Sequence, residues 1–96
     1  MPFLLLAAVL ALTPAEAADV RCVAVVGIAA RADPALVDSG REFAARVGAE
    51  VMDTAKASRE DVGDAFLAEG QRVIKVPPDR GEIDQCIARM VERLSR

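Results

Sequence analysis

The side chains of this chain that could carry chemistry are cysteines and carboxylates, because its 96 residues include no histidine. Without an imidazole, the sequence excludes a Ser-His-Asp or Cys-His catalytic arrangement and a histidine metal ligand. It also contains no glycine-rich phosphate-binding motif and no G-x-S-x-G motif of hydrolases. We therefore expect a protein that is not an enzyme and holds no cofactor or metal.

The two cysteines, Cys22 and Cys86, lie near opposite ends of the chain that follows the first apolar segment. An even number of cysteines in a small exported domain predicts a structural disulfide. A redox-active pair would need a C-x-x-C motif or a thiolate beside cations, and the sequence has neither. Closing so long a loop is expected to add about 4 kcal/mol to the stability of a small domain.

The carboxylates form two clusters, which are Glu60, Asp61 and Asp64, and Asp79, Glu82 and Asp84. Paired carboxylates can bind a cation or exchange protons. The alternating spacing of a calcium-binding loop is missing, however. Both clusters lie where a helix is expected to begin, so we favour the interpretation that they cap helices and complement the helix dipole.

The first part of the chain has the pattern of a secretory signal peptide. Residues 3–12 read FLLLAAVLAL, and Ala15-Glu16-Ala17 follows as a small-residue cleavage site. Ten apolar residues are too few to cross a bilayer, which needs about 20; a core helix and an interfacial anchor remain the alternatives. We expect residues 1–17 to be a signal peptide and residues 18–96 to be one periplasmic or secreted domain without a membrane span.

The composition also limits the partners of this domain. The formal net charge is −3 and only three residues are aromatic, all phenylalanine. A nucleic-acid-binding protein would carry a basic patch and aromatic side chains that stack on bases. A binding role would therefore involve another protein, whose identity the sequence leaves open along with the oligomeric state.

The spacing of apolar residues predicts four helices, over residues 20–30, 34–56, 58–74 and 79–96. The fold class is thus all-α, a small disulfide-stapled bundle of about four helices. The segment VRCVAVVGIAA at residues 20–30 is apolar nearly all round and rich in valine, so a strand paired with residues 72–76 is an alternative. As a helix, it would be the central, fully buried member of the bundle.

Small residues recur every four positions within the second expected helix, at Gly40, Ala44 and Gly48. We call this set the small-residue ridge. It allows another backbone to approach closely, and the expected neighbour is the first helix at Gly27 and Ala30. The alternative is a seam for a partner helix or another subunit.

The order of a signal peptide, Cys22 in a first helix and Cys86 in an amphipathic last helix resembles small exported bacterial helical proteins of unassigned function. It is more distantly similar to periplasmic acid-stress chaperones, which are short, helical and stapled by one disulfide. The first resemblance implies a structural or interaction role. The second implies a chaperone activated by acid, since protonation of the carboxylates at about pH 2–3 would leave the charge of 12 lysines and arginines.

Overall fold

The computed structural model describes residues 11–96, and all regular structure in this part of the chain is helical. The helices are α2 (Pro14–Ala32), α3 (Val37–Thr54), α4 (Arg59–Lys75) and α5 (Arg80–Leu94), with the short 3-10 helix η1 (Pro34–Leu36) before α3. The all-α prediction is confirmed. The alternative strand pairing is wrong, because residues 20–30 lie within α2 and residues 72–75 form the end of α4.

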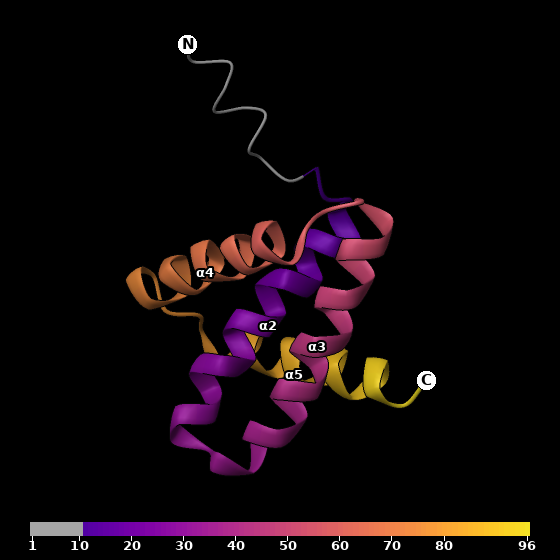
Figure 1. Cartoon of the computed structure of the whole chain (residues 1–96). Coiled ribbons are helices and arrows are strands. Elements are labelled where there is room, and N and C mark those ends of the chain that lie inside the picture. Colours follow the sequence, from indigo (N-terminus) through magenta and orange to yellow (C-terminus); the bar gives the residue numbers. More distant parts are fainter. Residues whose placement is uncertain (1–10) are drawn as a thin grey trace.

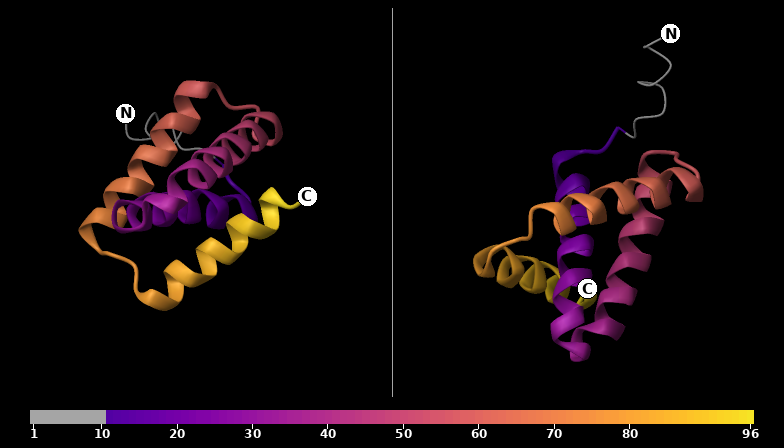
Figure 2. Two further views of the ribbon diagram at one scale, coloured as in Figure 1. Left: turned by 90° about the horizontal axis from the view of Figure 1, so that it is seen from below. Right: turned by 90° about the vertical axis from the view of Figure 1, so that its left-hand side faces the viewer.

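Helix α2 is the central element, and α3, α4 and α5 all pack against it (Figure 1). Helices α4 and α5 lie on opposite sides of α2 (Figure 2). After η1, α3 folds back beside α2. The hairpin of α2 and α3 projects at its turn beyond both α4 and α5, as the views in Figures 1 and 2 agree.

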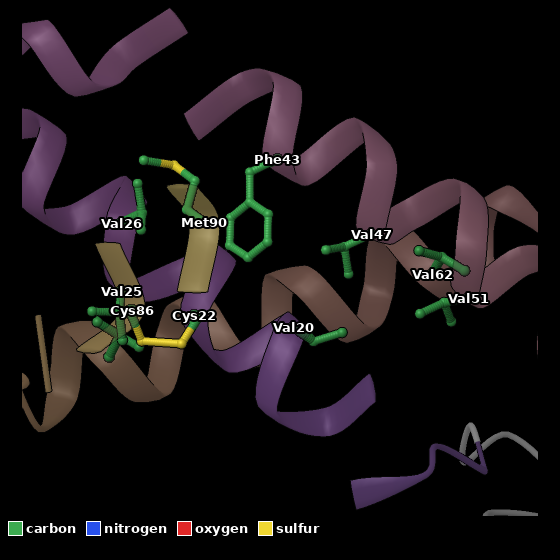
Figure 3. Packing of buried hydrophobic residues seen from close by; sticks show 11 residues of the cluster. Val20, Cys22, Val25, Val26, Phe43, Val47, Val51, Val62, Cys86 and Met90 are labelled. Carbon is green, nitrogen blue, oxygen red and sulfur yellow. A yellow bond between two sulfur atoms is a disulfide. The ribbon is translucent and has the colours of Figure 1, made fainter. Parts of the chain in front are cut away.

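The core is built mainly from valines and lies where the four helices meet (Figure 3). Phe43 of α3 and Met90 of α5 are its largest members and are exposed by 0% and 2%. Each such buried apolar side chain contributes about 1.5–3 kcal/mol through removal from water. The other buried apolar residues are Val20, Cys22, Val25, Val26, Val47, Val51, Val62, Val73 and Cys86.

The central position of α2 is confirmed, but its complete burial is not. Val25 and Val26 are wholly buried, whereas Val23 is half-buried and Gly27 is exposed. The last turns of α2, after Val26, lie in the hairpin of α2 and α3, which projects beyond α4 and α5 (Figure 1). These turns have α3 as a neighbour on one side, and their apolar side chains stay partly open to solvent.

Helix α2 begins earlier than the expected Val20 because Thr13 caps it. The Thr13 side chain accepts a hydrogen bond from the Glu16 backbone N–H, and the Glu16 carboxylate accepts one from the Thr13 N–H. This reciprocal capping, with Pro14 in the first turn, is a strong start signal. The expected cleavage point after Ala17 lies inside this first turn, while residues 1–10 of the expected signal peptide lie outside the described residues.

The second expected helix, over residues 34–56, is divided in the structure. Asp33 caps η1 by accepting a hydrogen bond from the Ala35 N–H, and α3 then starts at Val37. The helix ends at Thr54, shortly before Lys56, which has a φ of 52° in the left-handed region. A residue in that conformation cannot continue an α-helix.

The capping role assigned to the acidic clusters is confirmed for Asp79 alone, whereas Glu60 and Asp61 lie in the first turn of a helix that Ser58 caps. The Asp79 carboxylate accepts a hydrogen bond from the Glu82 N–H at the start of α5. At the start of α4, Ser58 accepts from the Asp61 N–H. Asp79 and Glu82 have the spacing of a capping box, but the Glu82 carboxylate binds Arg21 of α2 instead of the Asp79 N–H. Within residues 11–96, no group of carboxylates and cysteines is arranged to hold a metal ion.

Candidate interaction surface

The disulfide between Cys22 and Cys86 joins α2 to α5 in the core, as predicted (Figure 3). The two Cα atoms lie 4.9 Å apart, and both residues are buried, with exposed fractions of 8% and 2%. A thiolate that reacts with substrates must be accessible to solvent. The burial of this pair therefore fits a structural cross-link.

A buried carboxylate beside the disulfide binds two arginines of α5. Asp19 on α2 is 6% exposed and accepts a hydrogen bond from Arg89 Nε at 2.6 Å. Its second oxygen accepts a hydrogen bond from Arg93, which also donates to Glu50 of α3. Asp19 of α2 is thus bound directly to α5, and Arg93 extends the contact to Glu50 of α3.

A second ion pair joins the same two helices on the other side of the disulfide. Arg21 Nε and Nη2 donate to the two carboxylate oxygens of Glu82 at 2.9 and 3.0 Å. These hydrogen bonds lower the pKa of Glu82 below its usual 4.5. The interface of α2 and α5 is therefore held by a disulfide between two sets of charged contacts.

These cross-helix ion pairs were not predicted from the sequence. The partners Asp19 and Arg89 are 70 positions apart, so no local spacing reveals them. A signal was nevertheless present, since Asp19 lies one turn before Cys22 on the buried face of α2, and a buried carboxylate requires a cation. The arginines at positions 89 and 93 lie one turn apart and follow Cys86 on α5.

The small-residue ridge contacts two helices and not the first helix alone. A Cβ atom added at Gly40 would lie 3.2 Å from Val26 Cγ1 of α2, whereas one at Gly48 would lie 3.6 Å from Phe66 Cε2 of α4. The expected close approach at Gly27 is absent, because an added Cβ there would meet no atom within 4 Å. The ridge changes neighbour near Ala44, since α4 crosses only the later part of α3.

An apolar groove lies between the projecting parts of α2 and α3. It has a volume of about 380 Å³, at the lower end of the range for ligand pockets, and it is open to solvent. We call it the hairpin groove. Its apolar lining comes from both helices and from η1, and includes Val23, Val26, Ala30, Leu36, Val37, Gly40 and Ala44. The charged residues that line it are Arg31 and Arg41.

A second groove adjoins the first between α3 and α4, and we call it the α4 groove. It is lined by Ala44, Gly48, Met52, Val62 and Phe66, among others. The charged residue in its lining is Arg59. Because Ala44 lines both grooves, they meet along the small-residue ridge of α3.

Comparison of the chain with protein families, with characterised proteins and with solved structures finds no match. Within residues 11–96, no helix combines the length and the apolar character that crossing a membrane would require.

Proposed function

We propose that this chain is an exported, disulfide-stapled helical domain that binds another protein and has no catalytic activity of its own. The observation that carries this proposal is the hairpin groove, an open apolar surface that lies beside the packed core of the domain. Exposed apolar grooves of this kind are typical of protein-binding surfaces. A disulfide in so small a domain supports an oxidising compartment such as the periplasm.

The binding role can be tested with a photocrosslinking amino acid placed at Val37, which lines the hairpin groove. The control position is Val91, which is 55% exposed on α5 and lies outside both grooves. In the producing cell, we expect a discrete crosslinked product from position 37 and none from position 91. Equal products from both positions, or none from position 37, would contradict the proposal.

Export predicts a mature protein of residues 18–96. Cleavage after Ala17 removes the Thr13 cap and the hydrogen bond between Thr54 and Glu16, but keeps Asp19 and the core, which begins at Val20. We expect residues 18–96 to fold with a free energy of unfolding about 1 kcal/mol below that of residues 11–96, the typical value of a helix N-cap.

Two measurements check this prediction. The intact mass of the protein from the exported fraction should correspond to residues 18–96 with the disulfide formed. Urea denaturation should then compare that product with residues 11–96. A full-length mass in the cytosolic fraction would contradict export, and an exported product with another N-terminus would show that cleavage after Ala17 is wrong. An unfolded product of residues 18–96 would contradict the expected loss of only about 1 kcal/mol.

A second candidate function, an acid-activated chaperone, is favoured by the charged contacts between α2 and α5. Glu82 binds Arg21 of the facing helix as a carboxylate, so its protonation in acid would loosen this interface. The disulfide would keep the two helices connected in the opened state. Suppression of client aggregation at about pH 2–3 but not at pH 7 would support this function, and no suppression at either pH would contradict it.

The pH dependence of stability should reflect Glu82. Arg21 lowers the pKa of Glu82 in the folded protein. The ion pair therefore stabilises the fold fully above about pH 4.5, and this stabilisation is lost as the pH falls through the lowered pKa of Glu82. We expect Glu82→Gln to lower Tm at pH 7 by about 3 °C, and the difference from the parent protein to disappear near pH 2.

Thermal unfolding followed by circular dichroism across this pH range measures the effect. The matched control is Asp84→Asn, because Asp84 pairs with Arg80 in the same helix and both side chains are largely exposed. A Tm for Glu82→Gln that follows the control at every pH would show that the Arg21 contact does not stabilise the fold.

A further inference from the structure

We infer that the hairpin groove and the α4 groove together bind an amphipathic helix that carries carboxylates beside its apolar face and belongs to a different protein. This inference rests on the proposed binding function and adds the chemistry of the partner. Three features of the described residues lead to it: the shape of the two grooves, the charge of their linings, and the position of the arginines that form no ion pair.

The two grooves form one elongated surface along α3. They meet at Ala44 and follow the helix from Gly40 to Met52. At 1.5 Å per residue this stretch is about 18 Å long, which matches about three turns of a bound helix. Bound helices typically place apolar side chains at positions i, i+3 or i+4, and i+7 into such a surface.

The floor of this surface is apolar on both sides of Ala44. The partly exposed residues Val23 and Val37 line the hairpin groove, and the partly exposed Met52 and Phe66 line the α4 groove. Small residues at the centre allow a partner helix to approach closely. The apolar face of the partner is therefore accommodated by surface that the four helices leave uncovered.

The cations of the chain divide clearly by position. Among residues 11–96, the lysines and arginines that form no ion pair are Arg31, Arg41, Arg59 and Lys75. The first three are the charged residues that line the grooves, and all three are exposed. No carboxylate is among the lining residues of either groove, so the charge of both linings comes from arginines alone.

This arrangement favours a partner with carboxylates on both sides of its apolar face. Arg31 and Arg41 come from the two helices that flank the hairpin groove, so they border it from opposite sides, and Arg59 extends the positive charge to the α4 groove. Guanidinium groups bind carboxylates with two parallel hydrogen bonds, which adds direction to the attraction. The positive lining is local, since the chain as a whole has a charge of −3.

A second copy of this chain is the principal competing occupant. Among residues 11–96, its most exposed large apolar side chains on a helix are Leu67 and Ile74 of α4, which are 62% and 58% exposed. Insertion of that face into the groove of another copy would be a head-to-tail contact, which grows into chains unless its rotation closes a ring. The charge of the lining favours a partner that is more acidic than this helix, in which Arg59, Arg72 and Lys75 largely balance four carboxylates.

The test uses the oxidised protein and three synthetic helical peptides of about 15 residues. The first carries leucine and alanine on one face and glutamate on both flanks, the second replaces glutamate by lysine, and the third is a scrambled sequence with the composition of the first. Fluorescence polarisation measures their affinity. We expect the glutamate peptide to bind at least tenfold more tightly than the other two, with an affinity that falls as salt is raised.

Two variants locate the binding site. Arg41→Glu should weaken binding of the glutamate peptide at least tenfold, whereas Lys75→Glu changes the net charge equally outside the grooves and should have a much smaller effect. Gly27→Leu should also block binding, because it places a side chain in the hairpin groove. It is compatible with folding, since a Cβ at Gly27 meets no atom within 4 Å and glycine is a poor helix former.

The outcomes separate this inference from the proposed function. Site-specific crosslinking at Val37 without selective binding of the glutamate peptide would overturn the partner chemistry and leave a protein-binding role. Binding that survives Gly27→Leu would place the peptide elsewhere and overturn the site. Concentration-dependent association in analytical ultracentrifugation that Gly27→Leu abolishes would identify the occupant as a second copy and overturn the inference as well.

Discussion

Replacing Cys22 and Cys86 together by alanine is expected to lower the free energy of unfolding by about 4 kcal/mol. The disulfide closes a loop with a sequence separation of 64, and this constraint removes many conformations from the unfolded chain. A domain of this size buries a limited apolar area and has a correspondingly small net stability. The variant should therefore be largely unfolded near the upper end of the physiological temperature range. Urea denaturation followed by circular dichroism will measure the loss in the free energy of unfolding.

Reduction provides the control for this prediction. The parent protein, once unfolded and refolded in the presence of a reductant, should unfold at the same urea concentration as the double variant, and the reductant should not affect the variant. Because both cysteines are buried, reduction of the folded protein is expected to be slow. Equal midpoints for the oxidised and reduced parent proteins would show that the packing of α2 and α5 alone maintains the fold.

Much of the fold follows from local sequence. Ser58 and Asp79 precede amphipathic segments and cap α4 and α5 as their residue types predict. The regular spacing of Cys86 and Met90 places both in the core. Val91 follows the same apolar spacing on α5 but is 55% exposed, because the neighbouring helices cover only the centre of this apolar face.

The start of α2 was less predictable because one segment fits two different signals. Thr13 and Glu16 form a capping box, while Ala15 and Ala17 form the small-residue cleavage pattern. A processing enzyme recognises the chain in an extended form before it folds, whereas the cap exists only in the folded domain. Sequence patterns alone do not decide between the two, since each is locally complete.

The hairpin groove and the α4 groove could not be derived from the sequence, because they depend on how far α4 and α5 extend along α2 and α3. The small-residue ridge was expected to pack on α2 alone or to form a seam for a partner. In the structure, Gly40 contacts Val26 of α2 and Gly48 contacts Phe66 of α4. The uncovered grooves on either side of Ala44 result from the crossing position of α4, which long-range packing determines.

The long-range charged contacts explain why α5 takes its particular position. Apolar stripes on α2 and α5 would allow several registers, because valines and isoleucines pack with little directional preference. Asp19 and Arg21 have defined partners on α5, and each partner lies about one turn or two from Cys86. The ion pairs and the disulfide thus select the same register of the two helices.

Asp19, the buried carboxylate between α2 and α5, is expected to be the polar residue whose substitution destabilises the fold most. Asp19→Ala leaves Arg93, whose side chain is 11% exposed, without the carboxylate that it faces on α2. Removing one partner of a buried ion pair costs more than the pair itself contributes, because the remaining charge stays desolvated. Since Arg93 keeps Glu50 and Arg89 is more exposed, we expect a loss of about 2–3 kcal/mol in urea denaturation.

The control is Asp53→Ala, which removes an exposed carboxylate lying 4.0 Å from Lys56 and should cost less than about 0.5 kcal/mol. A double-mutant cycle of Asp19→Ala with Arg93→Ala separates the pair from other effects of each truncation. The cost of the double variant should be lower than the sum of the single costs by about 1 kcal/mol or more, because the double variant leaves no unpaired buried charge. Strict additivity, or a cost for Asp19→Ala no larger than that of Asp53→Ala, would show that α5 is positioned by the disulfide and apolar packing without this carboxylate.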